Sequence, residues 1–511
     1  MSGLSSLWYR LDLLSPKESV VEITRWRRPM NTRKFLILAA LALAGSAPAQ
    51  IPDTLWTATA GGSLLDYGRS VQQTGDGGFI VAGITETFGA GQQDMYLVKI
   101  AANGDICWTR TYGDSGIDGA HGVDTTAGGY IVAGCFQTAD NNQNMWVIRT
   151  DADGTPVCSL LYGGPALDYA THVQSTRDGH YVVSGKTVGT GYGGQDAFLM
   201  KLDGLLNVQW TLNMGGPEED GAHWVEEDAQ GDYILTGATR SGGAPDDLYL
   251  FKVSAQGDTI WTRSYGGDTT DIGDCVRPTS DGGYIVCGHT WSFGAGAYPD
   301  IYLIKTDSAG TVEWERAYGG DSADYGSSVV QADNGHFYVL GTTKTFGEGD
   351  YDILIMETDA QGCSLATVTY GGPGGELSYS LILTGDGYLA AAGGMWLPDN
   401  STDVCLIYFD RTPGFAKISP AKQPLTFALL PPHPNPFNPI TATRYELPAP
   451  GHVSLRVYDT AGRLVSTLVD GWKPAGAHEA TFDGAGLASG IYLVRLEAGE
   501  SIAMQKIVLL K

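Results

Sequence analysis

The sequence lacks the motifs that mark several common enzyme classes. It contains no GxSxG nucleophile elbow, no HExxH zinc motif and no GxxxxGK[ST] phosphate loop. Its seven cysteines lie far apart without a CxxC pair, which argues against a zinc site and leaves disulfide pairing open. Basic residues are scarce, because 31 Lys and Arg stand against 57 Asp and Glu. A net charge of −26 repels phosphate backbones, so we expect no nucleic-acid partner.

Long hydrophobic runs are also missing, apart from a short one near the start. Residues 30–50 read MNTRKFLILAALALAGSAPAQ, in which two basic residues precede the apolar run and small residues follow it. The run is about half the length that crosses a bilayer. We therefore interpret residues 1–49 as a leader with a secretory signal peptide, with Met30 as the true start, and expect no transmembrane anchor in the mature chain.

Glycine is abundant, with 71 residues, and its spacing reveals a repeat. The stretch DGGFIVAGITETFGAG at 76–91 returns as DGGYIVCGHTWSFGAG at 281–296. A Tyr-Gly-Gly signature, or a variant of it that keeps the first glycine, marks each unit. Intervals of 50 to 53 residues separate these glycines: Gly61, Gly113, Gly163, Gly215, Gly266, Gly319 and Gly371. Seven units therefore run through residues 50–412.

Each unit contains four short strand signals. In the fifth unit we place them at 274–279, 284–290, 300–306 and 311–318, joined by tight Asp-Gly-Gly and Ala-Gly turns that make neighbouring strands antiparallel. Segments such as YIVCG and IYLIK are apolar without alternation, so both faces of the sheet should be covered. Seven such sheets predict an all-β fold, a seven-bladed β-propeller with four-stranded blades, over a stacked solenoid.

The two ends of the repeat predict how the ring closes. The last unit lacks a fourth strand, whereas TLWTATAGG at 54–62 precedes the first unit and is similar to the fourth-strand signal DTIWTRSYGG at 258–267. We expect the early segment to complete the last blade and remove the open sheet edges. The repeat resembles exported bacterial seven-bladed propeller proteins, a resemblance that implies a fold but no single activity.

One position varies while its neighbours repeat. It lies three residues after the first acidic residue of each unit, where we expect the innermost strand to begin, near the channel mouth on the face that carries the long glycine-rich loops. The candidates are Arg69, His121, Thr171, His223, Asp274, Ser327 and Tyr379, with His172 one place further on and turned away by strand alternation. Imidazoles and a carboxylate can contact a ligand, and in principle hold a metal or transfer protons.

Other recurrent residues have a structural interpretation. An Asp or Asn heads the third strand of each unit and a Lys or Arg follows five residues later in the first five, which indicates turn capping and ion pairing. Tryptophans at matching places in the fourth strand, such as Trp56 and Trp261, should be packing residues. We expect no cofactor; residues 151–154, DADG, begin like a calcium loop without its remaining ligands, so calcium is a weak alternative.

A proline-rich linker at 413–432 leads to a second domain at 433–511. Alternating strand signals there, including VSLRVYD and RLVSTLVDG around a Thr-Ala-Gly turn, predict a small immunoglobulin-like β-sandwich. HPNPFNPITATRYELP (433–448), VYDTAGRLVSTL (457–468), LASGIYLVRL (487–496) and the terminal KIVLLK resemble the type A sorting domain of the type IX secretion system, itself similar to the immunoglobulin-like domain of flagellar hook-capping proteins. Ala442 stands where that family usually has a β-branched residue.

The resemblance implies passage through the secretion machinery to the outer cell surface or the extracellular space, while the hook-capping relatives leave a purely structural cap as the alternative. We expect a non-catalytic propeller that binds an extracellular glycan or protein through its long-loop face. Two alternatives remain open. One is an extracellular enzyme, carbohydrate-active or quinone-dependent, that uses the channel mouth, and the other is a rigid surface or adhesion spacer.

Overall fold

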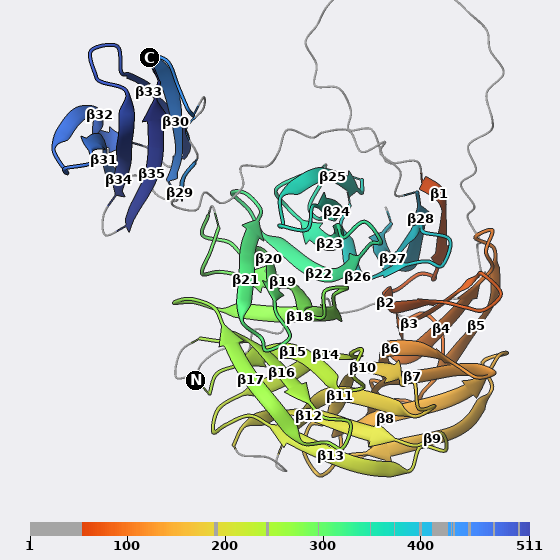
Figure 1. Ribbon diagram of the computed structural model, residues 1–511. Helices are drawn as coiled ribbons and strands as arrows, with labels where there is room; N and C mark the ends of the chain where they lie inside the picture. The colour runs from red at the N-terminus through yellow and green to blue at the C-terminus, as the bar shows by residue number, and fades with distance from the viewer. Residues whose placement is uncertain are drawn as a thin grey trace, which may run out of the picture.

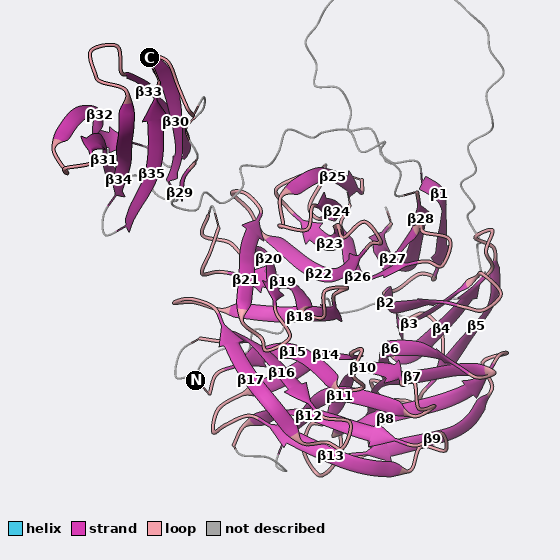
Figure 2. Cartoon of the chain, viewed as in Figure 1, coloured by secondary structure: helices cyan, strands magenta, loops and turns pink. Residues whose placement is uncertain are grey.

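The computed structural model describes residues 54–410 and 428–510, apart from gaps at 189–192, 242–244, 295, 348, 373, 398–400, 431, 433–434, 448–450, 474–475 and 499–500. The predicted leader and most of the predicted linker lie outside the described residues. Within the described part no helix is long and apolar enough to span a membrane. Figure 2 shows strands and loops throughout.

Seven four-stranded antiparallel sheets form a ring of blades, as the repeat predicts (Figure 1). The innermost strands surround the centre: β2 (Asp66–Gln73), β6 (Gly119–Thr126), β10 (Tyr169–Ser175), β14 (Asp220–Glu227), β18 (Asp271–Pro278), β22 (Asp324–Gln331) and β26 (Glu376–Leu383). The second strands are β3 (Phe79–Thr85), β7 (Gly129–Gln137), β11 (Tyr181–Val188), β15 (Tyr233–Thr239), β19 (Tyr284–Thr290), β23 (Phe337–Thr343) and β27 (Leu389–Trp396). The third are β4 (Asp94–Ile100), β8 (Gln143–Asp151), β12 (Gln195–Leu202), β16 (Asp247–Val253), β20 (Asp300–Thr306), β24 (Asp352–Thr358) and β28 (Thr402–Phe409). The outermost are β5 (Ile106–Tyr112), β9 (Pro156–Tyr162), β13 (Val208–Met214), β17 (Thr259–Tyr265), β21 (Val312–Tyr318), β25 (Ser364–Tyr370) and β1 (Thr54–Ala60).

The ring closes through its first strand. The seventh sheet has the order β1-β28-β27-β26, and β1 pairs antiparallel with β28 from Thr54 opposite Phe409 to Ala60 opposite Val404. The two ends of the repeat are therefore hydrogen-bonded into one sheet, which confirms the predicted closure and leaves β28 without a free edge.

The innermost strands begin earlier than the sequence pattern predicts. In the fifth blade β18 starts at Asp271, whereas we predicted a start at residue 274. The pattern failed because Gly273, the third residue of the strand, looks like a loop residue in the sequence. In the structure Gly273 pairs with Gly288 of β19, so it belongs to the sheet.

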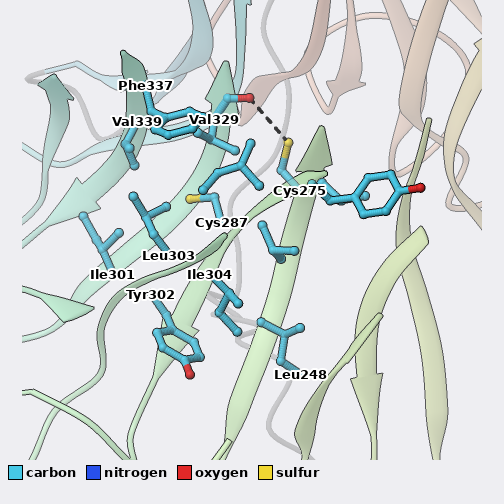
Figure 3. Packing of buried hydrophobic residues seen from close by; sticks show 14 of the residues in the cluster. Leu248, Cys275, Cys287, Ile301, Tyr302, Leu303, Ile304, Val329, Phe337 and Val339 are labelled. Carbon is cyan, nitrogen blue, oxygen red and sulfur yellow. Dashed lines mark hydrogen bonds between the residues drawn. The ribbon is translucent and has the colours of Figure 1, made fainter. Parts of the chain in front are cut away.

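The core lies between the blades. All seven residues of β20 are buried, as are six of seven in β19, which confirms that both faces of the sheet are covered. One apolar cluster joins three consecutive blades and includes Leu248 of β16, Leu303 of β20 and Val339 of β23 (Figure 3). Since each blade lies between two others, its apolar side chains pack on both sides and hold neighbouring blades in register.

The recurrent tryptophans and cations are structural, as predicted. Trp56 of β1 packs edge-on against Phe79 of the first blade, with ring centroids 5.6 Å apart, and its Nε1 donates to the carbonyl of Ala102. The third-strand lysines form salt bridges with the aspartate of the turn between the first two strands, with N–O distances of 2.8 to 3.0 Å: Lys99–Asp76, Lys201–Asp178 and Lys305–Asp281.

The second domain is a small β-sandwich. One sheet has the order β29-β30-β33 and the other β32-β31-β34-β35. Its strands are β29 (Ala428–Leu429), β30 (Ile440–Leu447), β31 (Gly451–Asp459), β32 (Leu464–Lys473), β33 (Gly476–Asp483), β34 (Gly490–Ala498) and β35 (Ser501–Leu509). Alternate side chains such as Val453, Leu455 and Val457 of β31 are fully buried between the sheets.

Candidate ligand-binding site in the propeller channel

The variable position identified in the sequence is a β-bulge in every blade. The pairing of each innermost strand with the second strand skips one residue, so that Gly68 pairs with Gly83 and Ser70 with Ala82 while Arg69 has no partner. The skipped residues in the other blades are His121, Thr171, His223, Asp274, Ser327 and Tyr379. All seven are partly exposed although their strands are otherwise largely buried. Because a bulge bends the strand and re-aims one side chain, we infer that the seven side chains face the channel that the innermost strands surround.

A recurring glycine accommodates each bulge. Gly83 of β3 lies so close to the bulged strand that a Cβ atom would be 1.7 Å from the carbonyl oxygen of Tyr67. The equivalent Gly288 of β19 would place a Cβ atom 1.9 Å from the Ile272 carbonyl oxygen. A glycine in the interior of a strand is the local sequence signal for a bulge or a close backbone approach. The recurring glycine in the second strand therefore permits the bulge in the first strand beside it.

Four bulge residues also bind the next blade. His121 Nδ1 lies 2.6 Å from the carbonyl oxygen of Ala170, and His223 Nδ1 lies 3.0 Å from that of Gly273. The Thr171 and Ser327 hydroxyls donate to carbonyls of the following blades, each at 2.9 Å. Burial, reinforced by the charge of Arg69, lowers the pKa of His121 to about 3. These four side chains therefore fasten blades as well as line the channel.

Asp274 is the centre of a polar and aromatic cluster in blades four to six. His289 of β19 donates from Nδ1 to Asp274 Oδ2 at 2.8 Å, and His223 Nδ1 lies 3.6 Å from Oδ1. Burial alone would raise the pKa of Asp274, but the two imidazoles outweigh it and hold this pKa well below its usual range. Tyr325 and Trp291 each contact His289 edge-on at 5.2 Å between ring centroids. Trp291 is 39% exposed, so part of its ring is accessible next to His289, which holds the Asp274 carboxylate.

His172 does not belong to this lining. It is 2% exposed and stacks on Trp224 of the next blade, with centroids 3.8 Å apart. Burial lowers its pKa to about 3. As strand alternation predicts, the side chain turns away from the channel, and burial between two blades leaves it no surface for an external ligand.

Sequence reasoning missed several side chains next to the bulges. His289 and Trp291 belong to the second strand and the loop after it, and Lys186 of β11 lies with its Nζ 5.9 Å from the Tyr169 ring. His289 and Lys186 occupy the same register position, opposite the residue that follows the first acidic residue of the blade. This position also varies among blades, which is the signal that could have found them.

The long loops are held on one face by buried carboxylates. Asp66 Oδ2 accepts a hydrogen bond from the Gly62 amide and another from the Thr87 hydroxyl, both at 2.8 Å. Gly62 lies in the loop between blades and Thr87 in the loop between the second and third strands, so one carboxylate joins both long loops. The predicted capping by third-strand aspartates is also present, since Asp94 accepts from the amides of Ala90 and Gly91 at 3.1 Å.

Six of the seven signature glycines lie between two such carboxyl groups, and Gly163 lies between Asp168 and the side-chain amide of Asn144. A Cβ atom on Gly113 would be 2.4 Å from Asp94 Oδ1 and 2.6 Å from Asp118 Oδ2. The seventh blade has Glu376 in place of the first aspartate, and it accepts a longer hydrogen bond of 3.3 Å from the Gly372 amide. Burial, with the nearby charge of Asp352, raises the pKa of Glu376 to about 7.

Residues 151–154, which begin like a calcium loop, form an ordinary turn between two strands. Asp151 is the last residue of β8, and its Oδ1 accepts from the amides of Asp153 and Thr155 as in an ordinary turn. Among the described residues no group of three or more His, Cys, Asp or Glu side chains is arranged to hold a metal ion. All seven cysteines are free thiols, and four of them are buried: Cys135, Cys275, Cys287 and Cys405.

The carboxyl-terminal β-sandwich matches a known family of secretion domains. Residues 433–510 match the family model of the secretion system C-terminal sorting domain. The chain carries a type IX secretion sorting domain. The sorting domain directs export to the cell surface or the extracellular space, and it implies interaction with the type IX secretion machinery.

No curated protein matches the chain. Among solved structures it is similar to PorZ, an essential surface component of the type-IX secretion system of Porphyromonas gingivalis, with 14% identity and a TM-score of 0.39. That match covers 92% of this chain and 61% of PorZ, so the chain spans less than two thirds of that protein. The periplasmic gluconolactonase PpgL of Pseudomonas aeruginosa is 11% identical, with a TM-score of 0.40, over 78% of this chain and 98% of that one. A glucose dehydrogenase is 10% identical, with a TM-score of 0.37, over 71% and 100%.

Proposed function

We propose that this exported propeller binds an extracellular ligand, a glycan or a protein, at the channel mouth and does not transform it. The proposal rests on one contrast, between residues that recur in the blades and the bulge residues, which vary. The carboxylates that hold the loops and the glycines that accommodate the bulges recur around the ring, whereas the seven bulge residues all differ except for two histidines. A constant scaffold with a variable, partly exposed lining is the arrangement of a recognition surface.

The aromatic residues beside the lining support the same function. Trp291 at 39% and Tyr298 at 57% exposure lie in the long loop that follows β19, and Trp291 contacts His289 of the cluster around Asp274. Trp and Tyr supply much of the binding energy at protein recognition sites because they bury large areas and keep a polar atom for a hydrogen bond.

The protonation states favour binding over proton transfer. A general acid or base works best when its pKa lies near the working pH. The imidazoles hold the pKa of Asp274 well below its usual range, while burial lowers those of His121 and His223. At neutral pH these groups are therefore a fixed carboxylate and neutral imidazoles, which is suitable for holding hydroxyl or amide groups.

The test is a binding screen of the full mature chain against arrays of glycans and extracellular proteins. Asp274→Asn and Trp291→Ala should each weaken binding of the captured ligand at least about tenfold, since each removes a contact of roughly 1.5–3 kcal/mol. Asp258→Asn is the matched control, because Asp258 is exposed in the tight turn before β17, at the far end of the strands from the long loops.

The outcomes separate the three functions. A ligand that is bound and recovered unchanged supports the proposal. Conversion of the ligand by the wild type that is lost in Asp274→Asn would establish the enzyme instead. Cell attachment that no single change on the long-loop face alters, with no ligand captured, would establish the spacer.

A further inference from the structure

Two cationic side chains in the channel wall, Arg69 and Lys186, form no ion pair with a carboxylate in the part of the chain that the structure describes. Arg69 is partly exposed, its Nε is buried without an acceptor, and its guanidinium donates to no other described residue. Lys186 is also partly exposed, and no carboxylate among the described residues forms an ion pair with it. Space for Lys186 exists because the facing residue is Gly221, whose Cβ would lie 2.4 Å from Lys186 Cε.

Within the described residues, cations without a carboxylate partner also occur on the outermost strands, where Arg110, Arg263 and Arg316 lie over tryptophan rings. The protein has a net charge of −26, and four of its five third-strand cations, at positions 99, 201, 252 and 305, form salt bridges with turn aspartates, while the fifth, Arg149, donates to the carbonyl of Gly204. Holding a cation in a partly desolvated wall without a counter-ion costs free energy. A local positive site within an acidic molecule is therefore the feature to explain, and an external anion supplies the missing partner.

The two cations belong to one continuous wall. Arg69 is close enough for its charge to lower the pKa of His121, and His121 contacts Tyr169 edge-on at 6.1 Å. Tyr169 in turn lies under Lys186. The cations therefore flank blades one to three, while Asp274 and Trp291 belong to blade five.

We propose, on the basis of the binding function above, that the channel mouth recognises an acidic saccharide that carries a carboxylate. Arg69 binds the carboxylate through two parallel hydrogen bonds, with Lys186 as a second positive charge. The sugar ring packs on the exposed part of Trp291, and Asp274 accepts hydrogen bonds from ring hydroxyls. Since Asp274 would repel the carboxylate, the carboxylate lies on the side of the wall formed by blades one to three.

The net charge of the protein also limits how many negative charges the ligand can carry. A net charge of −26 repels polyanions at long range, so one or two carboxylates fit better than a densely charged polymer. An acidic peptide also satisfies Arg69, and its N–H groups also donate to a carboxylate such as Asp274. A sugar ring offers several hydroxyl donors together with a flat apolar face, so we assign the saccharide, and acidic peptides are the competing ligand in the test.

The experiment presents the full mature chain with carboxylated saccharides, their neutral counterparts reduced at the carboxyl group, and acidic peptides. Binding is measured for wild type, Arg69→Gln, Arg69→Lys and Lys186→Gln, and Arg110→Gln is the matched control because its guanidinium lies over Trp108 on an outermost strand. Arg69→Gln should weaken carboxylated saccharides roughly ten- to hundredfold, with a smaller loss for Arg69→Lys. Arg110→Gln should bind like the wild type, and thermal melting checks that every variant folds.

Preference for the carboxylated saccharide that disappears in Arg69→Gln supports the inference. Binding of neutral saccharides with unchanged affinity in Arg69→Gln overturns it and leaves the proposed function in place. Binding confined to acidic peptides overturns the saccharide assignment. Capture of no ligand of any kind refutes the proposed function, and the inference falls with it.

Discussion

Replacing Glu376 by glutamine should make the propeller more stable at alkaline pH and leave it unchanged in acid. Glu376 is 4% exposed and lies with Asp352 against Gly371, whose Cβ would be 2.4 Å from Glu376 Oε2 and 2.0 Å from Asp352 Oδ1. The corresponding Asp324 of the sixth blade accepts from the Gly320 amide at 3.0 Å and the Thr345 hydroxyl at 2.6 Å. Glu376 accepts one longer hydrogen bond, of 3.3 Å from the Gly372 amide, so its negative charge is less well compensated than that of Asp324.

The magnitude follows from the pKa. Burial raises it from an ordinary 4.5 to about 7, and each pH unit corresponds to about 1.4 kcal/mol, so ionisation costs the folded state about 3 kcal/mol. The folded protein prefers the protonated carboxyl. The stability contribution is therefore complete below pH 4.5 and is lost as the pH rises through 7. Glutamine remains neutral, keeps an oxygen for the Gly372 amide, and removes this loss.

The assay is guanidinium unfolding of wild type and Glu376→Gln at pH 4 and pH 8, followed by tryptophan fluorescence. We expect equal midpoints at pH 4 and a free energy of unfolding up to about 3 kcal/mol higher for the variant at pH 8. Glu218→Gln, which changes an exposed glutamate, is the control and should show no such difference. A Glu376→Gln variant that is less stable than wild type at pH 8 would show instead that the ionised carboxylate stabilises the fold.

Two further predictions concern the carboxylates around the signature glycines and the export of the protein. Gly319→Ala should lower the free energy of unfolding by roughly 1–3 kcal/mol, because its Cβ would lie 1.7 Å from Asp300 Oδ1, whereas Gly75→Ala, with no atom within 4 Å, should be neutral; equal denaturation midpoints for the two variants would contradict the carboxylate frame. Deleting residues 431–511 should abolish delivery to the cell surface in a bacterium with type IX secretion, measured by surface labelling of intact cells, and undiminished labelling would contradict the sorting role.

Much of the fold was predictable because its determinants are local and repeated seven times. Turn glycines, apolar strands and the 50 to 53 residue period together define the blade, and the extra strand at 54–62 predicts the closure that β1 and β28 make. The start of the innermost strands was not predictable in this way. Gly273 looks like a loop residue until the strand opposite shows that it faces Gly288 in a bulged pair.

For the site, the sequence by itself determined which positions vary against a constant frame, and it placed Arg69, His121, His223 and Asp274 among them. Only the tertiary structure decided which side chains share a wall. The bulge sets the direction of each side chain. His121 and His223 form hydrogen bonds with carbonyls of the next blade, and Asp274 forms one with His289 of the neighbouring strand. Such contacts join residues 15 to 50 apart in the chain, and their existence depends on how blades pack. A one-dimensional pattern records neighbours along the strand and carries no information on neighbours across the channel.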